Sequence, residues 1–206
     1  MSFPIAVLIS GEGSNLQALL DSVHGQYGIE IVAVAASRAE ARGLARAEAA
    51  GVETAVFALA DQPDRALRDQ ELGDWLEERG AQLVVLAGFM ELLTPAFIRR
   101  FAGRIVNVHP ALLPAFPGLG AIEQALEHGV KVAGVTVHFV DEGVDSGPIV
   151  LQESFDLPYH RDIAAIEQCF HDVEHRLLPR AVRLIAAGRV QVDEGNPRLV
   201  RVEADD

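Results

Sequence analysis

The chain has 206 residues, of which 50% are hydrophobic and 23% charged, a balance typical of a globular protein with one substantial core. Thirty acidic against seventeen basic residues give a formal net charge of −13, which disfavours nucleic acid and anionic membranes as partners. The single cysteine excludes an internal disulfide and a cysteine-ligated zinc cluster and favours a reducing compartment. No apolar run reaches membrane-spanning length, and the first residues do not fit a signal peptide. We therefore expect a cytoplasmic protein.

Short β-branched runs alternate with stretches of helical periodicity along most of the chain. The runs predict strands at residues 5–9, 29–36, 83–86, 105–108, 135–140 and 149–151. This alternation indicates an α/β protein with a mostly parallel central sheet and helices on both faces. The first half in particular favours a Rossmann-like fold. We expect a single domain over residues 1–190 and a polar tail over residues 191–206, with an acidic end.

A glycine-rich loop follows the first expected strand and opens the first expected helix. Ser14 to Gln17 fits a capping box that would begin this helix. Backbone N–H groups of such a loop converge with the helix dipole, so Gly13, Ser14 and Asn15 are a candidate site for an anion such as phosphate. An ordinary tight turn would use the same residues.

Two common phosphate ligands do not fit this loop. A dinucleotide fingerprint needs a third glycine near Leu16 and an acidic residue ending the second strand, which instead ends in Ala36, Ser37 and Arg38. The sequence has no G-x-x-x-x-G-K-[ST] motif, and its lysine, Lys131, lies far along the chain. We therefore expect a small phosphorylated substrate.

The strand expected at residues 105–108 leads into a histidine and a proline. Alternation along a strand puts Asn107 and His109 on the same face. An amide can donate to a developing oxyanion while an imidazole moves a proton at neutral pH, and acyl or formyl transfer needs both roles. Alternatively, His109 satisfies backbone groups before Pro110, and Asn107 is a buried polar residue.

Two later elements carry polar residues among apolar ones. His138 shares the polar face of the strand 135–140 with Gly134 and Thr136, and we expect one face of this strand to border a cleft. Glu174 falls within the apolar stripe of the last long helix, where a carboxylate needs a partner. That partner is either an arginine or a substrate.

Six motifs occur in a fixed order and together resemble one family, the glycinamide ribonucleotide formyltransferases of purine biosynthesis. They are Leu8 to Asn15, Leu86 to Met90, Asn107 to Pro114, Phe116 to Gly118, Thr136 to Val140 and Asp145 to Ile149. The resemblance implies transfer of a formyl group from 10-formyltetrahydrofolate to the amine of glycinamide ribonucleotide. It implies the formyltransferase fold, no metal, and a monomer or homodimer acting on small molecules.

The resemblance also assigns roles to residues. It makes Asn107, His109 and Asp145 catalytic, with Asp145 favouring the imidazolium form of His109 and His138 in support. The substrate is bound by Gly13, Ser14, Asn15, His171 and Glu174. The folate is bound by Arg65, Met90, Glu91, Leu92, Leu93, Asn107, Asp141, Glu142, Gly143, Val144 and Asp145.

Other functions are compatible with parts of this pattern. A formyltetrahydrofolate hydrolase shares the three catalytic residues but passes the formyl group to water, and we expect it to carry an added N-terminal domain. A transferase acting on tRNA needs a basic surface and an RNA-binding domain. A non-catalytic binding module can use the same fold. Glu91 and Gly120 depart from the family, in which relatives often carry a basic residue and a histidine.

Overall fold

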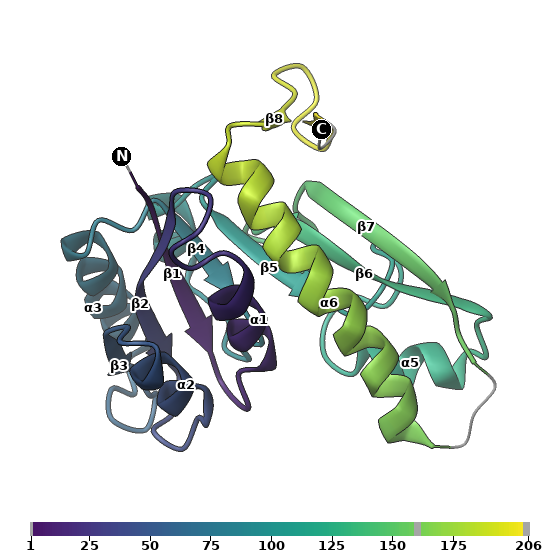
Figure 1. Ribbon diagram of the computed structural model, residues 1–206, viewed down its shortest axis with the longest axis horizontal. Helices are drawn as coiled ribbons and strands as arrows, with labels where there is room; N and C mark the ends of the chain where they lie inside the picture. The colour runs from purple at the N-terminus through teal and green to yellow at the C-terminus, as the bar shows by residue number, and fades with distance from the viewer. Residues whose placement is uncertain (1, 159–161, 204–206) are drawn as a thin grey trace. The chain divides into compact units, whose positions relative to one another are not determined.

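The computed structural model describes residues 2–158 and 162–203 (Figure 1). The chain forms two compact units, Met1–Asn107 and Val108–Asp206. The strand β5 (Ile105–His109) belongs to both, because its first three residues lie in the first unit and its last two in the second. The single domain expected over residues 1–190 stays a prediction.

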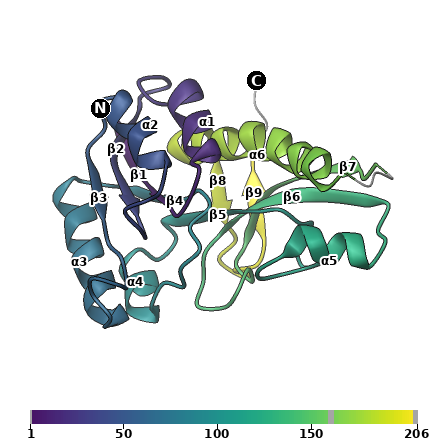
Figure 2. The same ribbon diagram turned by 90° about the horizontal axis from the view of Figure 1, so that it is seen from below.

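The first unit is a parallel sheet with helices on both faces. Its strands are β1 (Phe3–Ile9), β2 (Ile29–Ala36), β3 (Thr54–Val56), β4 (Leu83–Leu86) and the start of β5, in the order β3-β2-β1-β4-β5. Helices α1 (Ser14–Ser22) and α2 (Gly43–Ala49) cover one face. Helices α3 (Arg65–Glu78) and α4 (Pro95–Arg100) cover the other (Figure 2).

Burial on both faces explains the apolar strands of this unit. Residues 5–9 of β1 are fully buried, and every residue of β4 is buried as well, so neither strand alternates between polar and apolar residues. Asp64 and Thr94 begin α3 and α4, because their side chains accept hydrogen bonds from the first backbone N–H groups of each helix. Parallel strands bring the loops that follow β1 and β4 to the same edge of the sheet.

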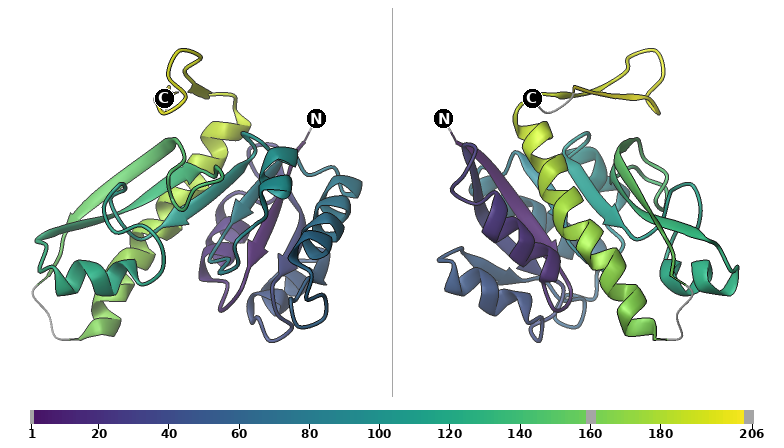
Figure 3. Two further views of the ribbon diagram at one scale, coloured as in Figure 1. Left: turned by 180° about the vertical axis from the view of Figure 1, so that it is seen from behind. Right: turned by 45° about the vertical axis from the view of Figure 1, so that its right-hand side comes forward.

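The second unit is built on an antiparallel hairpin of β6 (Val132–Phe139) and β7 (Ile149–Asp156). The long helix α6 (Ile163–Ala186) packs against both strands, and α5 (Ala121–Glu127) lies on the other side of the hairpin (Figure 3). A second, smaller hairpin joins β8 (Val190–Val192) to β9 (Val200–Val202). The segment expected as a polar tail therefore contains strand structure, and its last residues, 204–206, lie outside the described residues.

The structure confirms the predicted fold class. The strand order is β3-β2-β1-β4-β5-β6-β7, with antiparallel pairing between β6 and β7 and parallel pairing within the first unit. All six expected strands are present, with β6 and β7 longer than predicted. The strands β3, β8 and β9 were not predicted, because three residues are too few to show a period.

Two local predictions differ from the structure. The capping box at Ser14 is wrong, because Gly13 is the N-cap of α1, with φ of 71° and no capping side chain. Glycine suits this left-handed conformation because it has no Cβ. In β6 the apolar and polar faces are both buried, with Thr136 fully covered and His138 only 2% exposed. In the described part of the chain, no helix has the length and apolar character needed to cross a membrane.

Candidate active site

His109 lies at the end of β5 with its imidazole ring held from both sides. The residue is 5% exposed. Its Nδ1 lies 3.4 Å from Oδ2 of Asp145, and its Nε2 lies 2.8 Å from the carbonyl oxygen of Phe116. A carbonyl oxygen only accepts hydrogen bonds, so Nε2 carries a proton in this arrangement. The other ring nitrogen, Nδ1, faces the carboxylate of Asp145.

Asp145 contacts a second histidine and a backbone donor. Its Oδ2 accepts a hydrogen bond of 2.7 Å from the N–H of Gly118, and its Oδ1 lies 3.5 Å from Nε2 of His138. Burial raises the pKa of Asp145, but hydrogen bonds from His138 and Gly118 and the charges of both histidines outweigh it. The pKa of Asp145 is therefore below its ordinary value of 3.8, and the group is a carboxylate at neutral pH.

The loop that carries Asp145 is held by its own polar groups. Asp141 Oδ1 accepts hydrogen bonds from the N–H of Gly143, at 3.1 Å, and from the hydroxyl of Ser146, at 2.7 Å. Asp145 itself has φ of 49°, a left-handed conformation that a residue with a side chain seldom adopts. The loop therefore fixes the carboxylate in position. The prediction that residues 141–144 bind folate stays a prediction.

Asn107 lies two residues before His109 on the same strand. The alternation of β5 gives both side chains the same face, and Asn107 is partly exposed whereas His109 is buried. In the first unit, Asn107 pairs in register with Leu86 of β4. The same-face placement expected from sequence therefore agrees with the strand, and the catalytic roles of the two residues stay a prediction.

The glycine-rich loop begins α1 in a form that suits an anion. A Cβ on Gly13 would lie 2.6 Å from Cα of Gly43, so a glycine here allows α2 to approach the loop closely. Ser14 and Asn15 are the first residues of α1, where backbone N–H groups lack partners within the helix. Their role in binding phosphate stays a prediction.

Three arginines that sequence reasoning did not select contact this loop. Arg38 donates through Nε to the carbonyl of Ser10, and Arg46 donates through Nε to the carbonyl of Glu12 at 2.9 Å. Arg42 forms an ion pair of 3.2 Å with Glu12. Arg38 follows β2, Arg42 precedes α2 and Arg46 lies within it. They are about thirty residues beyond the loop, so no local motif joins them to it. They place positive charge beside the loop of an acidic protein.

The predicted folate loop after β4 is fastened at both ends. The N–H of Met90 donates to Oγ of Ser10 at 2.8 Å, and the N–H of Thr94 donates to Oδ2 of Asp69 at 2.6 Å. Ser10 and Asp69 are 2% and 3% exposed. The side chains of Met90, at the first of these ends, and of Leu92 are each 63% exposed. The loop therefore presents apolar side chains from a fixed backbone.

Arg65 and Glu91, both expected to contact folate, face each other. Nη2 of Arg65 lies 3.9 Å from Oε2 of Glu91. The side chains are 42% and 29% exposed, so solvent screens the pair. A folate carboxylate that binds Arg65 would compete with Glu91.

Helix α6 carries the remaining predicted substrate residues. The rings of His171 and His175 are stacked, with centroids 6.0 Å apart, and Glu174 is 7% exposed. Burial and the charge of His171 lower the pKa of His175, although Asp172 partly opposes them. Among residues 2–158 and 162–203, no group of three or more potential ligands is arranged to hold a metal ion.

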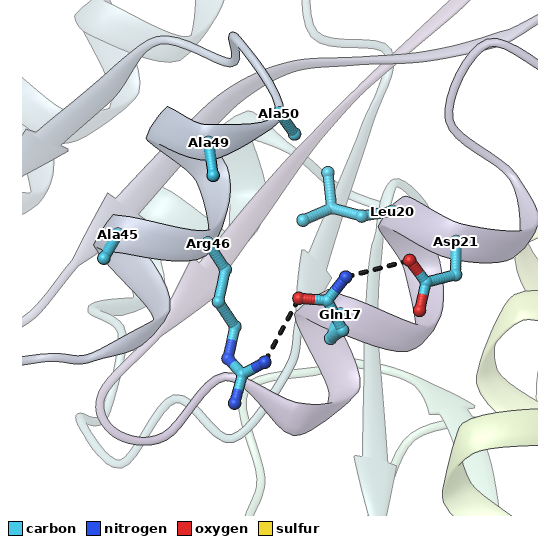
Figure 4. Close-up of a pocket in the computed structure, with 7 residues that line it drawn as sticks. All are labelled: Gln17, Leu20, Asp21, Ala45, Arg46, Ala49 and Ala50. Carbon is cyan, nitrogen blue, oxygen red and sulfur yellow. Dashed lines mark hydrogen bonds between the residues drawn. The ribbon is translucent and has the colours of Figure 1, made fainter.

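A shallow depression of about 450 Å³ lies between α1 and α2 (Figure 4). Arg46 donates a hydrogen bond to the side chain of Gln17, and Gln17 in turn donates one to Asp21. Alanines of α2 and Leu20 form the rest of its lining. None of the predicted site residues lines this depression, so it is not the proposed reaction centre.

A model of one protein family, described as formyl transferase, matches residues 4–182. The chain belongs to the formyl transferase family. The match covers the glycine-rich loop and the strand ending in His109, and it extends through most of α6.

Formyl transferase relatives match nearly the whole chain. The phosphoribosylglycinamide formyltransferase of Haemophilus influenzae is 40% identical over 92% of this chain and 90% of that protein. The trifunctional purine biosynthetic protein adenosine-3 is 44% identical in Drosophila pseudoobscura pseudoobscura and 43% in Homo sapiens. This chain matches 14% and 19% of those two longer proteins.

A solved formyl transferase structure has the same fold. The crystal structure of glycinamide ribonucleotide transformylase 1 from Symbiobacterium toebii has a TM-score of 0.92 and 45% sequence identity to this chain. The alignment covers 98% of this chain and 94% of that one. The α/β formyltransferase fold predicted from sequence is therefore confirmed.

Proposed function

We propose that this protein transfers a formyl group from 10-formyltetrahydrofolate to the amine of 5-phosphoribosylglycinamide in de novo purine biosynthesis. The products are formylglycinamide ribonucleotide and tetrahydrofolate. The Haemophilus relative, matched over 90% of its length, supports this activity. The observation that carries the chemistry is the pair of the buried His109 and the part-buried Asp145, with Nδ1 and Oδ2 3.4 Å apart.

The reaction exchanges one carbon–nitrogen bond for another. The amine attacks the formyl carbon, and the carbonyl oxygen becomes negatively charged in the tetrahedral intermediate. Asn107 donates a hydrogen bond to this oxygen. When the bond from the formyl carbon to folate N10 breaks, N10 gains a proton and the new amide loses one. His109 carries that proton, directly or through water.

Asp145 orients His109 during this proton transfer and stabilises its charged form. In the structure, Nε2–H of His109 donates to the carbonyl of Phe116. We infer that substrate replaces this carbonyl as the partner of Nε2, because Nδ1 already faces Asp145. Much of the rate then comes from holding the amine and the formyl group in line.

The two substrates bind through different residues. We assign the phosphate to Gly13, Ser14 and Asn15, and the ribose or glycinamide portion to His171 and Glu174. The folate contacts Arg65, residues 90–93 and residues 141–145. We propose that both substrates are small molecules, that no metal, nucleic acid or membrane takes part, and that a monomer or homodimer acts in the cytoplasm.

A spectrophotometric assay tests this function. Purified protein is mixed with 10-formyltetrahydrofolate, and its consumption is followed with and without 5-phosphoribosylglycinamide. Consumption that requires the ribonucleotide is the expected result. Consumption without it would identify a hydrolase instead, and no consumption in either case would contradict the transfer.

A further inference from the structure

The segment that follows β5, residues 110–118, is here called the strap. It touches both members of the pair of His109 and Asp145. The carbonyl of Phe116 accepts from Nε2 of His109, and the N–H of Gly118 donates to Oδ2 of Asp145. Any group that fixes the strap therefore also fixes the orientation of the imidazole.

One hydroxyl in the core of the second unit anchors the start of the strap. Thr136 on β6 is 0% exposed. Its Oγ1 donates to the carbonyl of Ala111 at 2.6 Å and accepts from the N–H of Leu113 at 3.1 Å. A third hydrogen bond, of 2.9 Å, comes from Nε2 of Gln152. The hydroxyl thus uses its one proton and both of its acceptor positions.

The neighbouring strand completes this anchor. Gln152 on β7 is the cross-strand partner of Thr136, and its Nε2 also donates to the carbonyl of Leu113 at 2.9 Å. Gly134 lies two residues before Thr136 on the same face. A Cβ on Gly134 would lie 2.6 Å from Cδ2 of Leu112. Residues 111–113 of the strap are therefore held against the hairpin by packing and by hydrogen bonds.

We propose that Thr136, supported by Gln152, is a positioning residue for the proton transfer by His109. This inference rests on the proposed function, because it concerns the rate of the formyl transfer. Without the hydroxyl, the Ala111 carbonyl and the Leu113 N–H lose a buried partner and the strap shifts to recover one. The Gly118 N–H at the end of the strap then no longer fixes Asp145, the carboxylate that orients Nδ1 of His109 during the reaction.

Two substitutions at Thr136 separate the hydroxyl from the volume of the side chain. Thr136→Val keeps the shape but removes the hydroxyl, and we expect about a tenfold fall in kcat with KM for both substrates within roughly twofold. Thr136→Ser keeps the hydroxyl and restores kcat. Steady-state kinetics with each substrate varied in turn gives this separation.

Glu153→Gln is the matched control. Glu153 is next to Gln152 on β7, but its side chain points to the opposite face, where Oε1 accepts from Nε of Arg176 on α6 at 2.8 Å. The substitution weakens contact between hairpin and helix without touching the strap. We expect unchanged kcat, and a fall equal to that of Thr136→Val would mean that the effect is general loosening of the unit.

Nitrogen NMR of the His109 ring provides a readout that does not depend on activity. Long-range ¹H–¹⁵N spectra should show one protonated Nε2 environment in the wild type, Thr136→Ser and Glu153→Gln, and an averaged or doubled signal in Thr136→Val. If Thr136→Val does not fold, Gln152→Leu removes the outer part of the anchor and should give a smaller change in the same direction. An unchanged His109 signal together with unchanged kcat would overturn the proposal. Because the spectra need no turnover, failure of the proposed function and failure of this inference are distinguishable.

Discussion

Both ring nitrogens of His109 face protein groups, and this constrains how the residue can act. The Nε2 atom lies 2.8 Å from the Phe116 carbonyl, and Nδ1 lies 3.4 Å from Asp145. Of these two partners, a neutral carbonyl is easier to replace by substrate than a charged carboxylate. Proton transfer is therefore expected at Nε2, with Asp145 remaining in place.

Removing either of two polar groups should slow the reaction strongly without unfolding the protein. Asn107→Ala removes the oxyanion donor, and Asp145→Asn removes the charge beside His109. Each should lower kcat by roughly a hundredfold or more. Circular dichroism checks that the variants are folded, and near-normal turnover in either one would remove that residue from the mechanism.

The lowered pKa of Asp145 predicts how stability depends on pH. The folded protein favours the carboxylate more than the unfolded chain does, so Asp145 stabilises the fold above its ordinary value of 3.8. This contribution is lost as the pH falls through the lowered pKa of the folded state. Urea unfolding at a series of acidic pH values should show that the free energy of unfolding falls less with decreasing pH in Asp145→Asn than in the wild type. Equal curves for the two proteins would contradict the assigned shift.

At the level of elements, the loop after β4 depends on two buried side chains from outside it. Ser10, just after β1, accepts a hydrogen bond from the N–H of Met90, and Asp69 on α3 accepts one from the N–H of Thr94. Neither contact is made by the side chains that we assign to folate. The backbone position of residues 90–93 is therefore set by the core of the first unit.

Loss of the Ser10 hydroxyl should weaken folate binding selectively. Ser10→Ala leaves the N–H of Met90 without its acceptor, and KM for 10-formyltetrahydrofolate should rise about fivefold, the value of one hydrogen bond. Ser37→Ala is the control, since it removes the 2.7 Å contact between Oγ of Ser37 and Oγ of Ser10 but leaves Met90 bonded. Initial rates at varied folate measure both, and equal KM values in the two variants would show that Met90 needs no such contact.

The ion pair of Arg68 and Asp69 in α3 makes a separate prediction about stability. Arg68 is 0% exposed, with Nη2 2.7 Å from Oδ1 of Asp69, and within the described residues its guanidinium makes no hydrogen bond. Asp69→Ala leaves this charge uncompensated and should lower the free energy of unfolding by about 3–5 kcal/mol. Glu91→Gln breaks the more exposed pair with Arg65 and should cost less than about 1 kcal/mol. Urea unfolding measures the loss of stability in both variants. Similar losses would show that burial does not decide how much an ion pair contributes to stability.

For the whole molecule, the fold could be predicted because its strongest signals are local. The largely buried strands of the first unit read as continuous apolar runs, and together with short β-branched runs in the second unit they located six strands. Asn107 and His109 could be paired because the period of a strand relates them directly. The start of α1 was predicted less accurately. Ser14 fits a capping pattern, but Gly13 is the N-cap and no side chain caps the helix.

The contacts that support the site could not be predicted, because they join distant residues. Thr136 reaches Ala111 across twenty-five positions, and Arg38 reaches Ser10 across twenty-eight. Threonine in a strand and arginine after one are ordinary residues that show no pattern of their own. The proximity of His109 to Asp145 was likewise inferred from family resemblance, since no spacing rule relates them.

The central claim is that a formyl carbon moves from folate to an amine, and isotopic labelling tests it most directly. The enzyme is incubated with 10-formyltetrahydrofolate labelled with ¹³C in its formyl group and with 5-phosphoribosylglycinamide, and the products are identified by mass spectrometry. We predict that the label appears in formylglycinamide ribonucleotide and that Asp145→Asn greatly slows its appearance. Label found in free formate, with the ribonucleotide unmodified, would contradict the account.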